Sequence, residues 1–213
     1  LAWGIAAKGV YNGLKDPNVN EFAIEFPNLP ESLDGYRIVH ISDVHASAAS
    51  RRWRTERIVS AVNSLDADLV CLTGDYSDGM SAAQSINVEP LGELKARDGV
   101  FAVTGNHEYY YDVLSWAVFY ERIGIRFLNG KCVYPRPGLA VGGVADPAAV
   151  RAFLPPPSTA SLFLGATNGE FRVLLQHRPH VGIPSPGAKC DLQLSGHTHG
   201  GVENGGSNTS TPN

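Results

Sequence analysis

The chain has 213 residues, of which 43% are hydrophobic and 18% are charged, and this balance is typical of one soluble globular domain with a sizeable core. The formal net charge of −4 is not the excess of positive charge that nucleic-acid-binding proteins carry, so we exclude nucleic acid as a partner. No apolar run is long enough to span a bilayer, and no signal peptide is recognisable. The sequence begins at Leu1 without an initiator Met, so we expect it to start inside a longer protein.

Short runs of β-branched and apolar residues predict strands, and their nearly continuous apolar character is typical of a sheet that is buried on both faces. These runs are residues 36–42, 68–74, 99–105, 139–145, 171–177 and 191–197. Apolar residues at helical spacing predict helices over 55–65 and 111–124, and Pro90 predicts a short helix that runs to Ala96. The alternation of strands and helices predicts an α/β sandwich.

Two further features are interpreted from local chemistry. Asp146 directly precedes Pro147, an arrangement typical of a helix N-cap with proline in the first turn. The three cysteines form no CxxC pair. Cys71 lies in an apolar run and is interpreted as a buried thiol, whereas Cys132 and Cys190 are either two free thiols or one disulfide.

Five short polar motifs each follow a predicted strand. They are SDVH with Asp43 and His45, TGDYSD with Asp75 and Asp78, TGNHE with Asn106, His107 and Glu108, the single His177 that closes VLLQH, and GHTHGG with His197 and His199. Each motif alone is typical of a structural histidine, a turn or a helix cap. Because open α/β sheets bind ligands at the carboxyl ends of their strands, we expect the five motifs to converge on one edge.

The residue types in these motifs predict a metal site. Carboxylate, imidazole and amide ligands together suit Mn, Fe, Co or Zn, and the lack of a thiolate in any motif argues against a structural zinc site. Asp43 and His45 are two residues apart at a strand end, so we expect their side chains to project to the same side. His197 and His199 are spaced so that each can face a different ion. We expect the flanking glycines to let the backbone turn sharply and to leave room beside the ions for a substrate.

The motifs DxH, GDxxD, GNHE, a later His and GHTH, in this order, resemble those of the calcineurin-like metallophosphoesterases from about Asp34 to Gly201. The resemblance implies an α/β sandwich of two mixed β-sheets flanked by helices. Relatives continue for a few dozen residues past GHTHGG, so we expect the C-terminal strand or strands to be missing here. We divide the chain into a lead-in over 1–33, a catalytic domain over 34–201 and a disordered polar tail over 202–213.

The resemblance also implies two divalent metal ions, with Mn as the first expectation and Fe, Zn or Co as alternatives. The ligands that it implies for one ion are Asp43, His45 and His199. The ligands that it implies for the other ion are Asn106, His177 and His197. Asp75 would bridge both ions.

The remaining motif residues are implied to take part in catalysis. His107 would face the scissile phosphate and protonate the leaving oxygen, Glu108 would orient His107, and Asp78 would support the loop. The implied enzyme is a dinuclear metal-dependent phosphodiesterase in which a metal-bridging hydroxide is the nucleophile and His107 is the general acid. A phosphomonoesterase on the same metal centre and a non-catalytic metal-binding scaffold, because of the truncated end, are the alternatives.

The sequence around the motifs is similar to that of a bacterial, membrane-associated phosphodiesterase branch, which includes enzymes that hydrolyse UDP-2,3-diacylglucosamine. We therefore expect a small-molecule phosphoester as substrate, either lipid-linked or a nucleotide-sugar phosphodiester. Relatives in this branch often carry transmembrane helices or an anchor before the domain, so we interpret residues 1–33 as the remnant of a membrane-proximal segment. We expect the full-length protein at the bacterial inner membrane, with the membrane surface as a partner, and the present chain to be soluble.

Arginines directly follow the first motif, in the text SRRWRTER. Arg51 and Arg52 are candidates for binding a substrate phosphate or an anionic membrane surface. The alternative is a solvent-exposed helix start with one half-buried tryptophan. Further along the chain, Tyr109, Tyr110 and Tyr111 are expected to pack beside the third motif, where one of them contacts substrate.

Overall fold

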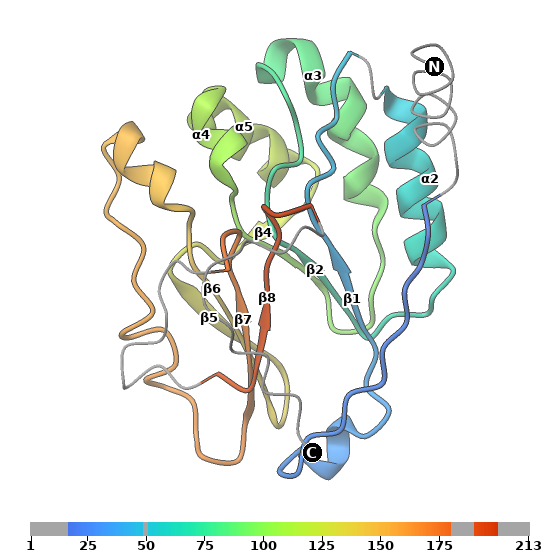
Figure 1. Ribbon diagram of the computed structural model, residues 1–213, viewed down its shortest axis with the longest axis vertical. Helices are drawn as coiled ribbons and strands as arrows, with labels where there is room; N and C mark the ends of the chain where they lie inside the picture. Colours follow the sequence, from blue (N-terminus) through green and yellow to red (C-terminus); the bar gives the residue numbers. More distant parts are fainter. Residues whose placement is uncertain (1–16, 49–50, 180–189, 200–213) are drawn as a thin grey trace, which may run out of the picture.

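Two four-stranded sheets pack against each other, and helices cover the outer face of the first sheet (Figure 1). A computed structural model describes the chain over residues 17–48, 51–179 and 190–199. In this part of the chain the strand orders are β1-β2-β3-β4 and β5-β6-β7-β8. The predicted α/β sandwich is therefore confirmed.

The two sheets differ in strand direction. The first is parallel throughout and consists of β1 (Ile38–Ile41), β2 (Leu69–Leu72), β3 (Val100–Ala102) and β4 (Arg126–Phe127). The second consists of β5 (Lys131–Arg136), β6 (Leu139–Gly143), β7 (Phe171–Leu175) and β8 (Leu192–Leu194). It is mixed, because β5 runs antiparallel to β6 while β6, β7 and β8 run parallel. The expectation of a mixed sheet thus fits the second sheet and not the described first one.

Helices connect the strands. The α-helices are α2 (Arg52–Asn63), α3 (Ser81–Val88), α4 (Asn106–Tyr110) and α5 (Val113–Arg122). The 3-10 helices are η1 (Glu31–Leu33), η2 (Glu89–Glu93) and η3 (Pro147–Ala152). Asp146 caps η3 by accepting a hydrogen bond from the backbone N–H of Ala148 at 2.8 Å, as its position before Pro147 predicted. None of the helices in the described ranges is both long enough and apolar enough to cross a membrane.

Strand β2 shows how the core is divided. Its residues Val70 and Leu72 belong to the cluster under α2, α3 and α5, whereas Leu69 and Cys71 belong to the cluster between the two sheets. Successive side chains of a strand point to opposite faces, so a strand covered on both sides must be apolar throughout. Burial raises the pKa of the Cys71 thiol, which is inaccessible to solvent as predicted.

The sheets approach each other closely at β6. A Cβ atom at Gly143 would meet side-chain atoms of Val103 and Leu128, so only glycine fits where β6 faces the first sheet. The outer face of the second sheet is covered by a loop instead of a long helix. Leu162 and Phe163 of this loop pack against Ala140 and Leu174.

Several predicted features have a different extent in the structure. All six predicted strands are present but shorter than their apolar runs, and β4, β5 and α3 were not predicted. Pro90 lies in η2, which ends at Glu93, so the predicted helix to Ala96 is wrong in length. Cys132 and Cys190 are free thiols, so the alternative of a disulfide is wrong.

Part of the predicted lead-in packs on the core. The Phe26 and Phe171 rings meet edge to face with centroids 4.8 Å apart, and Leu33 is buried between the sheets. Residues 1–16 and the predicted tail over 202–213 lie outside the described residues. The domain boundaries and the missing C-terminal strand therefore stay predictions.

Candidate metal centre

The five polar motifs meet at the carboxyl ends of the strands, at the upper edge of both sheets in Figure 1. Backbone hydrogen bonds join the loops beyond the strands. The N–H of Asp43 donates to Gly74 O at 3.1 Å, and the N–H of His45 donates to Asp75 O at 3.0 Å. The loop after β8 is joined to the loop after β7, because Gly196 N–H donates to His177 O at 2.9 Å. The predicted convergence on one sheet edge is thus present.

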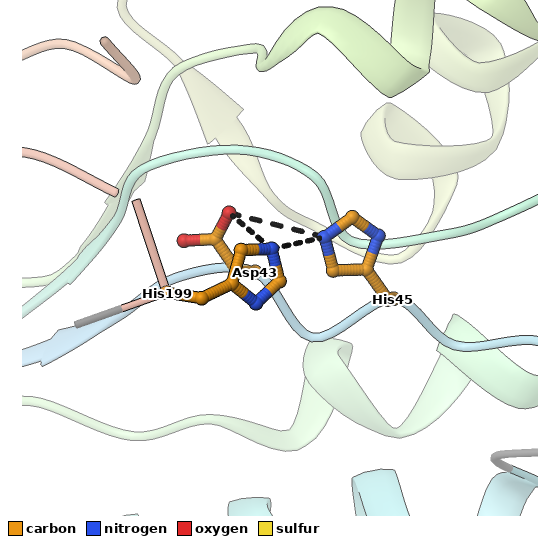
Figure 2. A group of neighbouring side chains, drawn as sticks. All are labelled: Asp43, His45 and His199. Carbon is orange, nitrogen blue, oxygen red and sulfur yellow. Dashed lines mark hydrogen bonds and ion pairs between the residues drawn. The ribbon is translucent and has the colours of Figure 1, made fainter. Parts of the chain in front are cut away.

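Asp43, His45 and His199 form the first group of possible metal ligands (Figure 2). The Nε2 atoms of His45 and His199 face each other at 3.1 Å. Asp43 Oδ1 lies 3.9 Å from the first of these nitrogens and 3.6 Å from the second. These three residues are the ligands that the sequence suggested for one ion.

The second group lies deeper and contains Asp75, His177 and His197. His177 Nε2 lies 3.1 Å from Asp75 Oδ2, 3.2 Å from His197 Nδ1 and 3.2 Å from Asn106 Oδ1. The other ring nitrogen of His177 is 2.7 Å from Thr73 O. This contact fixes the ring so that Nε2 faces the group. Asn106, which the sequence also suggested as a ligand, lies beside this group.

Asp75 lies between the two groups. Its Oδ2 atom is 3.1 Å from His177 Nε2 and 3.9 Å from His45 Nε2, which fits the bridging position suggested by the sequence. Burial alone would raise the pKa of Asp75. The hydrogen bond and charge of His177 outweigh that effect, so the pKa of Asp75 is lowered. For His177 the signs are reversed. Burial alone would lower its pKa, but the hydrogen bond and charge of Asp75 outweigh burial, so the pKa of His177 is raised. The two side chains are therefore electrostatically coupled in a buried place.

Asp78 contacts two histidines. Its Oδ1 lies 2.8 Å from His45 Nδ1 and 2.6 Å from His107 Nδ1. The first contact is a hydrogen bond, whereas the second is an ion-pair contact outside hydrogen-bond geometry. With Nδ1 of each ring turned to this carboxylate, Nε2 of each ring faces Asp75, at 3.9 Å. Asp78 thus contacts both rings, whereas only loop support was predicted for it.

Glu108 contacts backbone amides of two loops. Its buried carboxylate accepts hydrogen bonds from the backbone N–H groups of Asp75 at 3.0 Å, Tyr76 at 2.9 Å and Gly105 at 2.7 Å. It therefore joins the loop after β2 to the start of α4. The carboxylate is directed to these amides, and the contact to the His107 ring comes from Asp78. Orientation of His107 by Glu108 therefore stays a prediction without a direct contact behind it.

The backbone is left-handed at five of the seven suggested ligands. The φ angles are 53° at Asp43, 45° at His45, 55° at Asp75, 71° at His197 and 50° at His199. Such angles are uncommon for residues with a side chain, and strained backbone of this kind gathers at functional sites. The side chains of Asp43 and His45 therefore converge through left-handed turns, and not through the strand alternation that we expected.

Glycines allow the loops to approach one another. A Cβ atom at Gly105 would collide with Asp75 Oδ1, and one at Gly196 would collide with Ser42 Oγ and Asp43 Oδ2. We expected the glycines of GHTHGG to make the turn. Gly196 instead provides room, since the left-handed angles fall on His197 and His199 themselves. Gly200 and Gly201 lie outside the described residues.

The arginines suggested for substrate binding do not join the group. Arg52 pairs with Glu56 at 2.7 Å and Glu89 at 2.5 Å on α2 and the adjoining η2. Arg51 is the exposed N-cap residue of α2. Because the guanidinium of Arg52 is already held by two carboxylates, the alternative of a solvent-exposed helix start fits it better. Substrate binding by Arg51 stays a prediction without structural support.

Residues outside the motifs also support the site. Tyr76 is fully buried, donates its hydroxyl to Val103 O at 2.6 Å and accepts the Gly74 N–H at 2.9 Å, which locks the loop after β2. Arg178 follows His177 and pairs with Asp146 at 2.8 Å. The sequence signal for Arg178 was its position next to a motif histidine, which we did not use.

Comparison with known proteins gives matches over most of the chain. The family model described as calcineurin-like phosphoesterase matches residues 36–201. A transmembrane protein with metallophosphoesterase domain from Danio rerio is 34% identical over 208 residues, covering 92% of this chain and 48% of the relative. An uncharacterized metallophosphoesterase of Aquifex aeolicus is 32% identical over 86% of the chain and 70% of the relative. One from Helicobacter pylori is 29% identical over 91% of the chain and 52% of the relative. The chain thus spans about half the length of several of the curated relatives it matches.

Proposed function

The chain belongs to the calcineurin-like phosphoesterase family, and we propose that it is a phosphoric ester hydrolase with two divalent metal ions. The observation that supports this most strongly is Asp75 between two groups of metal-ligating side chains. Names of relatives from different organisms carry the word metallophosphoesterase, which agrees with the proposal.

The donor atoms fit divalent cations. In each group two ring nitrogens face each other, at 3.1 Å for His45 and His199 and at 3.2 Å for His177 and His197. A carboxylate oxygen lies beside each pair of nitrogens. Neutral imidazole and carboxylate together suit Mn, Fe, Co or Zn. Asp43, His45 and His199 would hold one ion, Asn106, His177 and His197 the other, with Asp75 shared, and we propose Mn as the first ion to test.

Bound metal ions would supply a water of lowered pKa and positive charge for the phosphate oxygens. The chain's own residues would do the rest. His107 has Nδ1 beside Asp78 and is partly exposed, so its Nε2 is free to hold a proton at the edge of the group. A proton on Nε2 can pass to the leaving oxygen. General acid catalysis of this kind contributes roughly 10²–10⁴-fold.

We propose that the substrate is a phosphodiester, either lipid-linked or a nucleotide sugar, as expected of the membrane-associated branch that includes UDP-2,3-diacylglucosamine hydrolases. A general acid placed to protonate an alkoxide supports an ester with an alkyl leaving group, and a monoester of the same alcohol needs that proton equally. A monoesterase on the same residues is the alternative. The names of the Danio rerio and Bos taurus relatives describe transmembrane proteins, which supports the membrane surface as partner of a longer protein.

Hydrolysis of two aryl esters after loading with Mn²⁺ tests the proposal. The protein is stripped with chelator, dialysed against Mn²⁺ and assayed with bis(p-nitrophenyl) phosphate and p-nitrophenyl phosphate. We expect Mn²⁺-dependent release of nitrophenol, faster from the diester. Nitrophenolate leaves without a proton, so His107→Ala should lose more activity on a methyl or phenyl ester than on the nitrophenyl esters. Faster release from the monoester would favour the alternative. Two bound ions without turnover on either ester would indicate a non-catalytic scaffold and contradict the proposal.

A further inference from the structure

A fixed arginine lies at the edge of the metal-ligating groups. Arg178 directly follows His177, and its Nε and Nη2 atoms contact the two carboxylate oxygens of Asp146 at 2.8 and 3.3 Å. The Asp146 carboxylate is buried and also caps η3, so it is itself held in place. About a third of the Arg178 side chain, 31%, remains exposed. The guanidinium is therefore anchored on Asp146 while part of the side chain stays exposed to solvent.

An exposed aromatic ring adjoins this arginine. Tyr110 is the last residue of α4, and 46% of it is exposed. Its ring centroid lies 5.5 Å from that of His107, and it is also in hydrogen-bond contact with Arg178. A second guanidinium, that of Arg151 in η3, lies 5.5 Å over the Tyr110 ring. The ring thus lies beside the proposed general acid and contacts two arginines.

The position of Arg178 relative to the metal-ligating groups is also defined. Arg178 directly follows His177, whose Nε2 lies 3.2 Å from His197 Nδ1, so Arg178 adjoins the second group of metal-ligating side chains. Asp146 neutralises one of the two arginines, whereas Arg151 has no carboxylate contact among the ion pairs of the described residues. The surface beside Tyr110 therefore has an excess of positive charge.

We propose that Arg178, Tyr110 and Arg151 bind an oxyanion, a carboxylate or phosphate, carried by the leaving group of the substrate. This rests on the proposed function, in which His107 protonates the leaving oxygen. A group attached to that oxygen would lie near His107, whose ring adjoins Tyr110 at 5.5 Å and Tyr111 at 6.1 Å between centroids. Of these two tyrosines, Tyr110 is the one with Arg151 over its ring. Planar guanidinium groups pair with two oxygens of a carboxylate or phosphate, and an aromatic face accepts the carbon frame between them.

The test compares leaving groups that have the same size but different charge. The substrates are phenyl phosphodiesters whose leaving phenols are 4-hydroxybenzamide, 4-hydroxybenzoate and 4-hydroxyphenylphosphonate. For each anionic ester, kcat/KM is divided by the value for the amide ester, so that general effects on catalysis cancel. We expect this ratio to be about tenfold higher in the wild-type protein than in Arg151→Met or Arg178→Met. A tenfold effect is about the size of one charge-assisted contact at a partly exposed site. The larger of the two ratios identifies carboxylate or phosphate as the preferred anion.

Two variants keep the test sound if Arg178→Met fails to fold because Asp146 loses its partner. Arg151→Met removes an exposed guanidinium without leaving a buried charge. Arg122→Met is the matched control, since Arg122 also lies over an aromatic ring, at 5.2 Å from Phe119, at the C-terminal end of α5. The control should keep the wild-type ratio. An equal ratio in wild type and Arg151→Met, or a ratio of one in wild type, would overturn the proposal.

Binding separates this inference from the proposed function. Calorimetry with the Mn²⁺-loaded protein compares 4-carboxyphenylphosphonate with 4-carbamoylphenylphosphonate, neither of which can be hydrolysed. Tighter binding of the carboxylate that is lost in Arg151→Met supports the oxyanion subsite even if no ester is turned over. Equal binding of the two ligands overturns it, whether or not the esters are hydrolysed.

Discussion

Replacing Glu108 by glutamine tests whether this residue joins two loops or orients the proposed acid. The carboxylate accepts three backbone N–H groups, two at Oε2 and one at Oε1. A glutamine has a single oxygen. With that oxygen at the Oε2 position, the amide nitrogen faces the Tyr76 N–H, so one bond is lost and two donors meet in a buried place. Hydrogen bonds to charged groups contribute about 1.5–3 kcal/mol, and an unsatisfied buried donor costs about 1–3 kcal/mol more.

We therefore expect Glu108→Gln to lower the free energy of unfolding by about 3 kcal/mol, which lowers Tm by about 6–12 °C in a protein of this size. Thermal unfolding is measured without metal at pH 8, and Glu121→Gln, an exposed change of the same chemistry on α5, is the control. If Glu108 oriented His107 instead, kcat would fall while Tm stayed within the error of the control. That outcome would refute the assignment made from the three amide contacts.

Three further predictions concern residues of the same site. Burial and then the charge of Asp75 raise the pKa of Glu108 from 4.5 to about 7, so the metal-free protein should lose stability as pH rises through this window, and urea titrations should show a weaker loss in Glu108→Gln. The rise in the pKa of His177 acts in the same direction in both proteins. Asp78→Asn should weaken binding of the ion held by Asp43, His45 and His199 and lower kcat by about 10–100-fold, because Asp78 contacts the rings of His45 and His107. Unchanged kcat and metal content would contradict this. Gly196→Ala should lower metal affinity by pushing Asp43 aside, whereas Gly169→Ala, where a Cβ meets nothing within 4 Å, should not; calorimetric titration of Mn²⁺ measures both.

The position of the site could be predicted because it depends on topology. Asp43, Asp75 and His177 each follow an apolar strand, and the carboxyl ends of parallel strands share an edge. The missed elements lack such a signal. Helix α3 buries only Val88, so it shows no apolar stripe. Strand β5 contains Pro135 and a register shift between Val133 and Arg136, which is typical of an edge strand.

The direction of individual side chains could not be read from the sequence. Asp78 and Glu108 are both acidic residues near His107 in their motifs, and only the loop backbone decides which carboxylate reaches the ring. The left-handed angles at His45 and His199 likewise change where these side chains point. Such angles depend on contacts between loops far apart in the chain, as at Gly196 and Asp43. Roles within the site therefore required the structure, whereas membership of the site did not.

Elemental analysis of metal content tests the central claim most directly. Wild type, His107→Ala and Asp75→Ala are dialysed against Mn²⁺ and then against buffer, and bound metal is counted per chain. The arrangement of Asp75 between the two groups predicts two ions in wild type, two in His107→Ala and loss of both in Asp75→Ala. A wild-type protein that binds no more than one ion, or an Asp75→Ala variant that keeps two, would contradict a shared dinuclear centre.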